Sequence, residues 1–276
     1  MSIVTINRGS YSRGKEVAER LAARLGYECI SRDVLLDASN EFNIPEIKLV
    51  RALHDPATVL DRFQNGRERY ISYLYSALLQ QARKDDIVYH GLAGQYFLRN
   101  IPHVLKVRII ADMEDRVAEE MRRENIPEES ARYILQKDDD ERRKWGLQVY
   151  GTDTWDSRLY DVVLCIGRLT VDDAVEILAD VVRKPAFRTT GESQRLLDDQ
   201  ALSARVVANL VGSFPRTRVA ARDGVVFVVV PDQTQGGRNE ARLREIVLSV
   251  EGVREAVFDA APPDAQTGHV NPFHNL

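Results

Sequence analysis

The sequence predicts an α/β protein in which helices cover both faces of a mostly parallel sheet, followed by a second, small α+β domain. Three observations lead to this fold class. Strand-like runs of β-branched residues alternate with helical stretches up to about residue 185. A glycine-containing loop joins the first such run to the first helix, and the alternation restarts after a linker-like stretch. The length of 276 residues also exceeds the usual span of one domain, about 100 to 200 residues.

Composition limits the classes of protein to which the chain can belong. Hydrophobic residues make up 44 % and charged residues 29 % of the sequence, which fits a soluble protein with a core. The net charge of -4 provides no overall attraction to nucleic acid, so no nucleic-acid partner is expected. No run approaches the roughly 18 apolar residues of a transmembrane helix, and residues 1–6 lack the basic start of a signal peptide. We therefore expect a cytoplasmic protein.

The two cysteines, Cys29 and Cys165, are too few for a disulfide framework and do not have the spacing of a metal site. Free cysteine is among the most frequently buried residue types. Both are therefore expected to be buried thiols.

The first domain, residues 1–185, is expected to follow a repeating order of strands and helices. Residues 3–6 are a strand-like run, and residues 16–26 form a helix in which Val17, Leu21 and Leu25 share one face. A more variable helical region follows to about residue 83. Strands are then expected at 86–90, 105–110 and 160–166, with helices around 93–99, within the charged stretch 112–145, and at 171–182.

Residues 186–198 have the composition of a linker, and a second domain is expected at 199–260. Asp223-Gly224 between two strand-like runs is a good hairpin signal. The tail, residues 261–276, is expected to be poorly ordered. The elements of the second domain are a helix at 200–210, strands at 217–221 and 225–230, a helix at 239–250 and a strand at 256–258.

The first loop carries a chemical signal. Gly9 and Gly14-Lys15 have the Gly-x-x-x-x-Gly-Lys spacing of a phosphate-binding loop and lie between the first strand and the first helix. In such a loop glycines let consecutive backbone N–H groups point inward, and Lys15 would reach the β- and γ-phosphates. Glu16 stands where a Ser or Thr hydroxyl usually binds Mg²⁺. The alternative is an ordinary strand-to-helix turn with surface cations.

Three segments resemble the cytidylate kinase-like family. Gly14-Lys15-Glu16 is similar to the Gly-Arg-Glu that ends the first loop of that family, and Ser31-Arg32-Asp33 to its segment on the monophosphate side. Residues 89–98 are similar to its Gly-Arg-x-Ala-x-x-x-Leu segment, with Leu92 in place of the Arg. The resemblance spans about residues 1–183. It implies a P-loop kinase-type three-layer fold, the use of ATP and Mg²⁺, and a nucleoside monophosphate as the phosphoryl acceptor.

The resemblance also implies roles for individual residues. The acceptor side comprises Arg32, Asp33, His90 and Gly91, although Asp33 could equally cap a helix that begins at Val34, and His90 could be structural. No metal ligand is assigned. The residues expected to bind the phosphates of ATP are Gly9, Ser10, Tyr11, Ser12, Arg13, Gly14, Lys15 and Glu16.

The charged stretch 112–145 resembles the lid of these kinases. Asp139 and Arg142 have the spacing of an Asp-x-x-Arg element that packs over the triphosphate. Phosphoryl transfer requires positive charge around the transferred group in a site closed to water. A solvated charged helix with ordinary i,i+4 pairs is the alternative. The catalytic residues that the resemblance implies are Lys15, Arg142, Arg116 and Arg123.

The second domain resembles a BON domain, a small module found mainly in bacterial envelope and osmotic-stress proteins. The resembling features are Asp223-Gly224 leading into a strand and Gly252-Val253 preceding the last strand. This resemblance implies a protein or small-ligand partner and a regulatory or binding role. The arginines of the module either form a basic face for an anionic partner or are simply solvated.

Together these observations predict ATP-dependent phosphoryl transfer to a nucleoside monophosphate, with a C-terminal regulatory or binding module. Two alternatives remain open. One is a nucleotide sensor without useful catalysis, and the other is a scaffold with a relict site. The identity of the acceptor and the oligomeric state are also open.

Overall fold

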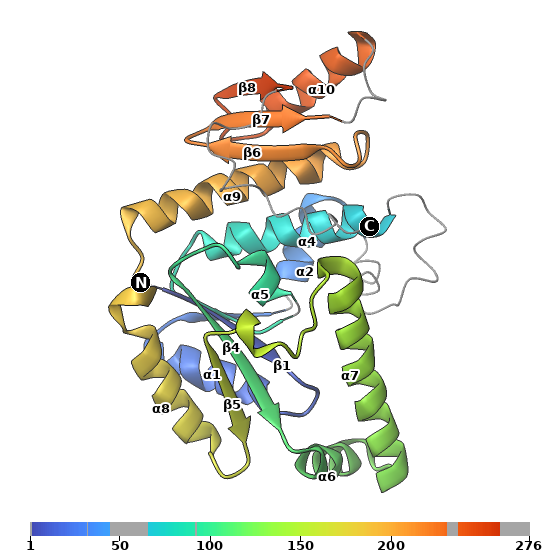
Figure 1. Cartoon of the computed structure of the whole chain (residues 1–276), viewed down its shortest axis with the longest axis vertical. Helices are drawn as coiled ribbons and strands as arrows, with labels where there is room; N and C mark the ends of the chain where they lie inside the picture. The colour runs from blue at the N-terminus through green and yellow to red at the C-terminus, as the bar shows by residue number, and fades with distance from the viewer. Residues whose placement is uncertain (1, 32, 45–65, 92, 231–236, 260–276) are drawn as a thin grey trace. The chain divides into compact units, whose positions relative to one another are not determined.

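A computed structural model describes residues 2–31, 33–44, 66–91, 93–230 and 237–259. Its internal contacts divide the chain into two units, which are drawn in Figure 1. The first unit comprises Met1–Asp33 and Lys84–Thr190, and the second comprises Val34–Arg83 and Gly191–His274. The predictions for Arg32, Leu92 and the tail from residue 261 lie outside the described residues.

A parallel sheet of five strands, in the order β2-β3-β1-β4-β5, forms the centre of the first unit. Ile3 of the central strand β1 pairs with Ile87 on one side and with Val104 on the other. The predicted mostly parallel sheet is confirmed, and the three-residue strand β2 is the one that the sequence pattern did not reveal. The strands are β1 (Ile3–Arg8), β2 (Glu28–Ile30), β3 (Ile87–Tyr89), β4 (Val104–Ala111) and β5 (Val162–Ile166).

Helices cover both faces of this sheet (Figure 1). On one face α1 and α8 pack together, and Val17, Leu21 and Leu178 are fully buried there. On the other face lie α5 and the end of α7, where Tyr96 and Tyr150 stack with ring centroids 4.0 Å apart. The charged stretch is a pair of helices, α6 and α7. The helices are α1 (Gly14–Leu25), α5 (Gly94–Phe97), α6 (Met113–Glu124), α7 (Glu128–Tyr150) and α8 (Val171–Val182), with short 3-10 turns at Ser157–Leu159 and Pro185–Phe187.

The second unit joins two helices from the middle of the chain to the C-terminal elements. Helix α4 packs along α9, and the side chain of Gln200 on α9 donates a hydrogen bond to the hydroxyl of Tyr75 on α4. Tyr73 stacks on Phe42 with ring centroids 4.0 Å apart. Tyr73 and Tyr75 are buried, so they are core residues of this unit. The helices are α2 (Asp33–Glu41), α4 (Gly66–Ala82), α9 (Gly191–Leu210) and α10 (Gly237–Ser249).

The C-terminal elements form a three-stranded sheet in the order β6-β7-β8, in which β7 is antiparallel to β6 and parallel to β8. Asp223 (φ 47°) and Gly224 (φ 80°) make the expected hairpin turn. Val206 of α9, Val228 of β7 and Val247 of α10 belong to one buried cluster. The element order expected over residues 200–258 is therefore present. The strands are β6 (Arg218–Arg222), β7 (Val225–Val229) and β8 (Glu255–Phe258).

Part of the expected linker 186–198 is helical. Helix α9 begins at Gly191, and Leu197, Ala201 and Ala204 are fully buried along one side of it. This spacing of three to four residues is that of a helix face that packs against a partner. Because α4 supplies the partner surface, the helix extends further towards the N-terminus than the polar composition suggested.

The expectation of two buried thiols is wrong for Cys165, which is exposed, whereas Cys29 is half-buried. β5 is an edge strand of the sheet. Successive side chains of a strand point to opposite faces, and Leu164 packs towards the buried core of α1 and α8. Cys165 and Val163 point the other way, where Val163 is 39 % exposed. An apolar run in an edge strand therefore did not guarantee burial on both faces.

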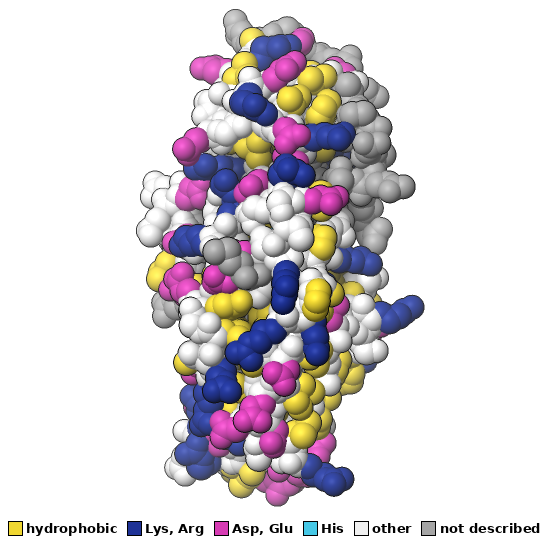
Figure 2. Space-filling view, turned by 90° about the vertical axis from the view of Figure 1, so that its left-hand side faces the viewer, with side chains coloured by type: hydrophobic (Ala, Val, Ile, Leu, Met, Phe, Trp, Pro, Cys, Tyr) yellow, Lys and Arg dark blue, Asp and Glu magenta, His cyan; other side chains and the backbone are white. Residues whose placement is uncertain are grey.

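Charged side chains of both signs cover the surface drawn in Figure 2, where Lys and Arg are intermixed with Asp and Glu. Opposite charges close together partly offset each other's field. Across the described portion of the chain, no helix is both long and apolar enough to cross a membrane.

Thr170 begins α8 with a capping box, in which its hydroxyl accepts from the N–H of Asp173 at 3.1 Å and its own N–H donates to the Asp173 carboxylate at 2.8 Å. Thr170→Ala should lower the free energy of unfolding by about 1 kcal/mol, because it leaves a helix N–H without its acceptor. Urea denaturation would measure the change. Asp180→Ala on the exposed side of the same helix is the control, with an expected change below about 0.5 kcal/mol. Equal urea midpoints for Thr170→Ala and the wild type would contradict the role of the cap.

Candidate functional site

The loop between β1 and α1 starts at the carboxyl edge of the sheet and presents backbone donors. Tyr11 (φ 55°) and Arg13 (φ 61°) are left-handed, on either side of Ser12. Left-handed residues in such a turn direct neighbouring N–H groups to one side and form an anion-binding concavity. Arg13 is also the N-cap of α1 and makes no side-chain cap, so the first N–H groups of the helix lack an intrahelical acceptor. The loop therefore combines free donors with the positive end of a helix dipole.

The two glycines of the loop have different roles. A Cβ on Gly14 would lie 2.6 Å from the Cβ of Arg8, so α1 can start this close to β1 only without a side chain. A Cβ on Gly9 would have no neighbour closer than 3.7 Å. The left-handed residues of the loop are Tyr11 and Arg13, and neither Gly9 nor Gly14 has a positive φ. Gly14 instead serves close packing.

Lys15 and Glu16 lie in the first turn of α1. The Nζ of Lys15 is 3.6 Å from Glu19, and its side chain is 63 % exposed. Glu16 is engaged by Arg13 at 2.9 Å and by Arg20 at 2.6 Å. The ammonium of Lys15 is therefore accessible to a ligand, whereas the carboxylate of Glu16 is held by two guanidinium groups.

The hairpin of α6 and α7 is anchored to this loop by side chains. Arg116 of α6 is buried and donates from Nε to the carbonyl of Ser10 at 2.8 Å. Its two Nη atoms donate to the carboxylate of Asp139 on α7 at 2.7 and 2.9 Å. The hydroxyl of Ser10 donates to Asp138 at 3.0 Å. Asp139 thus fixes Arg116 at the loop.

The other two arginines predicted for the lid also reach the loop or its start. The Nη1 of Arg142 donates to the carbonyl of Arg8 at 2.7 Å, and burial lowers the pKa of Arg142. The guanidinium of Arg123 lies 5.2 Å from the ring centroid of Tyr11. Burial raises the pKa of Tyr11, and a hydrogen bond with Glu120 acts in the same direction. All the lid residues named from the sequence are therefore near the loop.

His90 and Gly91 follow β3 at the same edge of the sheet. His90 is buried, and its Nδ1 has no hydrogen-bond partner. Burial lowers the pKa of His90 to about 4, and the charge of Arg8 acts in the same direction. A side chain on residue 91 would overlap the hydroxyl of Tyr89. Glycine is therefore required where the chain passes this ring, and His90 is held as a neutral imidazole.

Asp33 is the first residue of α2 and is exposed. Its carboxylate accepts a hydrogen bond from the N–H of Ser31 at 3.2 Å. This bond links the carboxylate to the chain before the helix and thus stabilises the turn after β2. A contact between Asp33 and an acceptor stays a prediction.

The sequence analysis missed two arginines in the carboxyl-terminal halves of strands. Arg8 ends β1 directly before the loop. Arg108 of β4 donates to the carbonyl of Thr154 and lies 5.7 Å from the ring centroid of Tyr160. A cation near the carboxyl end of a parallel strand is the signal that could have identified both, because ligands of open α/β sheets bind at this edge.

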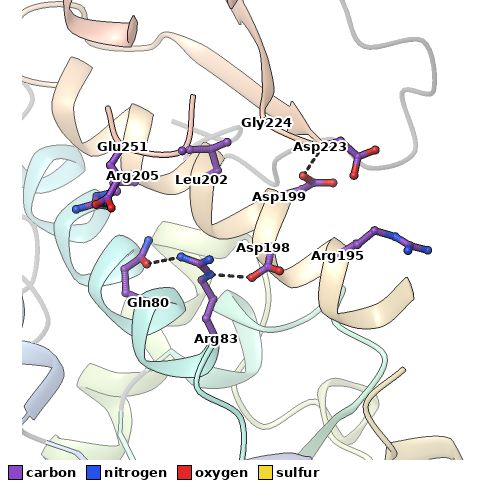
Figure 3. A pocket seen from close by; sticks show the side chains of 11 residues that line it. Gln80, Arg83, Arg195, Asp198, Asp199, Leu202, Arg205, Asp223, Gly224 and Glu251 are labelled. Carbon is purple, nitrogen blue, oxygen red and sulfur yellow. Dashed lines mark hydrogen bonds and ion pairs between the residues drawn. The ribbon is translucent and has the colours of Figure 1, made fainter. Parts of the chain in front are cut away.

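The second unit contains a cavity of about 260 Å³, shown in Figure 3. On its wall Arg83, the residue after α4, donates to Asp198 of α9 at 2.7 Å and to Gln80 of α4 at 3.1 Å. The carboxylate of Asp199 accepts from the N–H of Asp223 at 2.7 Å. Burial raises the pKa of Asp199, and the charge of Asp223 adds to this effect. Most of the residues that line the cavity are charged, and they come from α4, α9, the β6–β7 turn and the segment after α10.

Gly14→Ala should destabilise the protein by about 1 to 3 kcal/mol, because the new methyl group must displace the Arg8 side chain or shift α1. Gly9→Ala is the matched control, since its methyl group would make only ordinary contacts, and its expected change is within about 0.5 kcal/mol. Urea denaturation of both variants compares them. Equal losses of stability would show that both glycines serve the backbone conformation, contrary to this account.

His90 should make the protein less stable as the pH falls. Its pKa of about 4 in the folded protein is below the value of about 6.5 for an unfolded histidine, so the unfolded state binds more protons between these pH values and the free energy of unfolding decreases on acidification. The charged groups around it are Arg8, Lys15, Glu19 and Asp33.

His90→Gln should therefore flatten the decrease in urea midpoint between pH 7 and pH 5. His103→Gln should flatten this decrease for the same reason, because burial also lowers the pKa of His103. His103 lies before β4, at the other end of the sheet, so the two variants compare two separate buried histidines. An unchanged pH dependence in His90→Gln would contradict the neutral, buried state of His90.

Comparisons with known proteins agree with this architecture. A family model described as the cytidylate kinase-like family matches residues 3–168. No curated protein matches the chain. Among solved structures, an uncharacterized protein from Eubacterium ventriosum ATCC 27560 is 22 % identical with a TM-score of 0.52, over 66 % of this chain and 97 % of the other. At this identity the match shows a common fold.

Two further solved structures are similar at lower scores. A shikimate kinase from Acinetobacter baumannii is 12 % identical with a TM-score of 0.38, over 66 % of this chain and 93 % of the other. A gluconokinase from Sinorhizobium meliloti 1021 is 15 % identical with a TM-score of 0.40, over 67 % of this chain and 93 % of the other. Because the family model covers more than half of its residues, the chain belongs to the cytidylate kinase-like family.

Proposed function

We propose that this protein is an ATP-dependent phosphotransferase with a nucleoside monophosphate as acceptor, and that residues 199–260 are a BON-like regulatory or binding module. The observation that carries the proposal is the loop before α1. The loop leads into the N-terminus of α1, which has no side-chain cap, and Arg116 and Arg142 of the lid contact the same loop or its start. Membership of the cytidylate kinase-like family supports the choice of reaction class.

The residues present fit the phosphates of ATP. The free N–H groups of the loop and the exposed ammonium of Lys15 are donors suited to phosphate oxygens. No group of three or more metal-binding side chains occurs within the described ranges. Mg²⁺ commonly needs only one or two carboxylates in addition to phosphate oxygens. Ser10 and Asp138, hydrogen-bonded at the loop, would hold it, and bound Mg²⁺ would supply charge neutralisation between the phosphates.

In the proposed reaction an oxygen of the acceptor attacks the γ-phosphorus, and the bond to the β-phosphate oxygen breaks to release ADP. The side chains contribute positioning and positive charge. Arg142 and Lys15 provide charge beside the transferred group. Arg116 shares its charge with Asp139, so this pair chiefly positions the lid at the loop. On the acceptor side, Arg32, Asp33, His90 and Gly91 remain the proposed contacts.

Arg142→Ala should reduce kcat with ATP and the preferred monophosphate by about 100-fold or more, because it removes a preorganised cation near the transferred phosphoryl group. Lys15→Ala should cause a comparable loss. Arg143→Ala is the matched control, since the neighbouring Arg143 is exposed and pairs with Asp153 instead. If Arg142→Ala and Lys15→Ala retained the wild-type rate, the assigned roles would be wrong.

The acceptor can be identified by thermal denaturation with ATP and Mg²⁺, followed by a panel of nucleoside monophosphates. A ligand that binds only the folded protein raises the melting temperature. We expect a rise with ATP and a further rise with one monophosphate. No rise with any nucleotide would contradict the proposal and favour a scaffold with a relict site.

A second candidate function is a nucleotide sensor that reports through the C-terminal module. Glu16 and Arg116 are both engaged in ion pairs within the protein, which favours binding without fast chemistry. The polar cavity of the second unit would accept a small ligand of the module. Saturable ATP binding with no turnover of any monophosphate would favour the sensor over the enzyme.

A further inference from the structure

Arg8 is a half-buried cation, and its guanidinium forms no ion pair with any residue that the structure describes. Its stem packs against the start of α1, where a Cβ on Gly14 would lie 2.6 Å from the Cβ and 3.2 Å from the Cδ of Arg8. Burial lowers the pKa of Arg8, and the charge of Arg142 acts in the same direction. Among the residues described, the guanidinium of Arg8 has no hydrogen bond and no ion pair. Keeping such a group from water without a partner is costly.

His90 offers a second unpartnered group at the same edge of the sheet. β1 and β3 are parallel neighbours with Thr5 opposite Tyr89, so both strands end at this edge. His90 directly follows β3, is only 6 % exposed, and its Nδ1 has no partner. With this register Arg8 and His90 lie at the ends of neighbouring strands, and the positive charge of Arg8 helps to lower the pKa of His90. A buried imidazole nitrogen and a half-buried guanidinium are thus placed at one edge of the sheet, each able to donate to an anion.

We propose that Arg8 and His90 form a subsite that binds the anionic group of the phosphoryl acceptor, a phosphate or a carboxylate. This assignment rests on the phosphotransferase function proposed above. It restricts the acceptor to molecules that carry their own negative charge. A neutral alcohol would leave the Arg8 guanidinium unpaired, as in the free protein.

The surroundings of the subsite favour the acceptor over ATP. The charged groups that act on His90 are Arg8, Lys15, Glu19 and Asp33, which belong to β1, α1 and the start of α2. None of these four belongs to the lid helices α6 and α7, whereas Arg116, which contacts the loop through Ser10, does. Arg142 of α7 donates to the carbonyl of Arg8, and Lys15 lies in the first turn of α1, so the subsite adjoins the proposed site for the ATP phosphates. His90 follows β3, and this position puts the anion that His90 and Arg8 would bind on the β3 side of that site.

The decisive variant is Arg8→Met, which keeps an unbranched stem against Gly14 and removes the charge. We expect KM for the acceptor to rise by about 10- to 100-fold, the value of a charge-assisted hydrogen bond, while KM for ATP changes less than about twofold. Arg8→Lys should recover part of the lost affinity for the acceptor, because it restores the positive charge but not the planar guanidinium with its several donors. Arg24→Met, an exposed arginine at the end of α1, is the control and should leave both KM values unchanged.

Two kinetic outcomes would overturn the subsite. An unchanged KM for the acceptor in a folded Arg8→Met would show that Arg8 does not contact it. An equal rise in KM for ATP and for the acceptor would assign Arg8 to the donor or to general stability. Melting temperatures of Arg8→Met with and without ATP verify that the variant is folded and binds the donor.

A measurement without turnover separates this inference from the proposed function. In full-length protein with ¹⁵N-labelled histidine, inorganic phosphate and acetate are titrated while the His90 imidazole is followed by NMR, with His90→Gln providing the assignment. An anion beside the ring should raise the pKa of His90 in the wild type but not in Arg8→Met. A response to phosphate alone would indicate a phosphate-bearing acceptor, and a response to acetate a carboxylate. No response to either anion would refute the subsite, whereas a response in a protein without phosphotransfer would refute only the proposed function.

Discussion

The close approach of α1 to β1 at Gly14 is the constraint on which the site depends. Gly14 is the first residue of α1 and has no side chain. The backbone of the helix can therefore lie against the side chain of Arg8, at the carboxyl end of the central strand β1. The chain must then turn between Arg8 and Gly14, and it does so with left-handed Tyr11 and Arg13, conformations that cost of order 1 kcal/mol or more each. The same geometry leaves the first N–H groups of α1 without a side-chain cap. The packing of α1 on β1, the strained backbone of the loop and its capacity to bind an anion thus all follow from the close approach at Gly14.

The arginines around this loop are held in different electrostatic states. Arg116 forms a bidentate ion pair with Asp139, which offsets its charge. Arg116 therefore serves mainly to position the lid at the loop. Within the described part of the chain, the carbonyl of Arg8 is the hydrogen-bond partner of Arg142, and the guanidinium of Arg8 has none. The charge of Arg142 lowers the pKa of Arg8, so these two half-buried cations raise the free energy of the empty site. A bound anion would relieve this repulsion. The relief would contribute to the free energy of anion binding.

How far the sequence predicts this structure depends on whether a feature is local. The face of α1 carried by Val17, Leu21 and Leu25 follows from helix periodicity, and the resemblance to kinases placed Arg142 near the loop. β2 is too short to show alternation. The exposure of Cys165 depends on which face of an edge strand is covered. Arg8 has no ion pair among the described residues because of the residues that surround it in the fold, and these are far apart in the sequence. No local sequence pattern could therefore reveal this feature.

The grouping of α4 with the C-terminal elements changes how the module relates to the rest of the chain. Aromatic and aliphatic residues of α4 are buried around Ile71, Tyr75 and Leu78, and α9 provides part of that cover. The chain then runs from Arg83, on the wall of the second cavity, to β3 at Ile87 and on to His90. The chain thus passes between the two units at residues 33–34, 83–84 and 190–191, and not only at the stretch 186–198 that the sequence marked as a linker. The composition of that stretch could not reveal the other two crossings, because they depend on which elements α4 packs against.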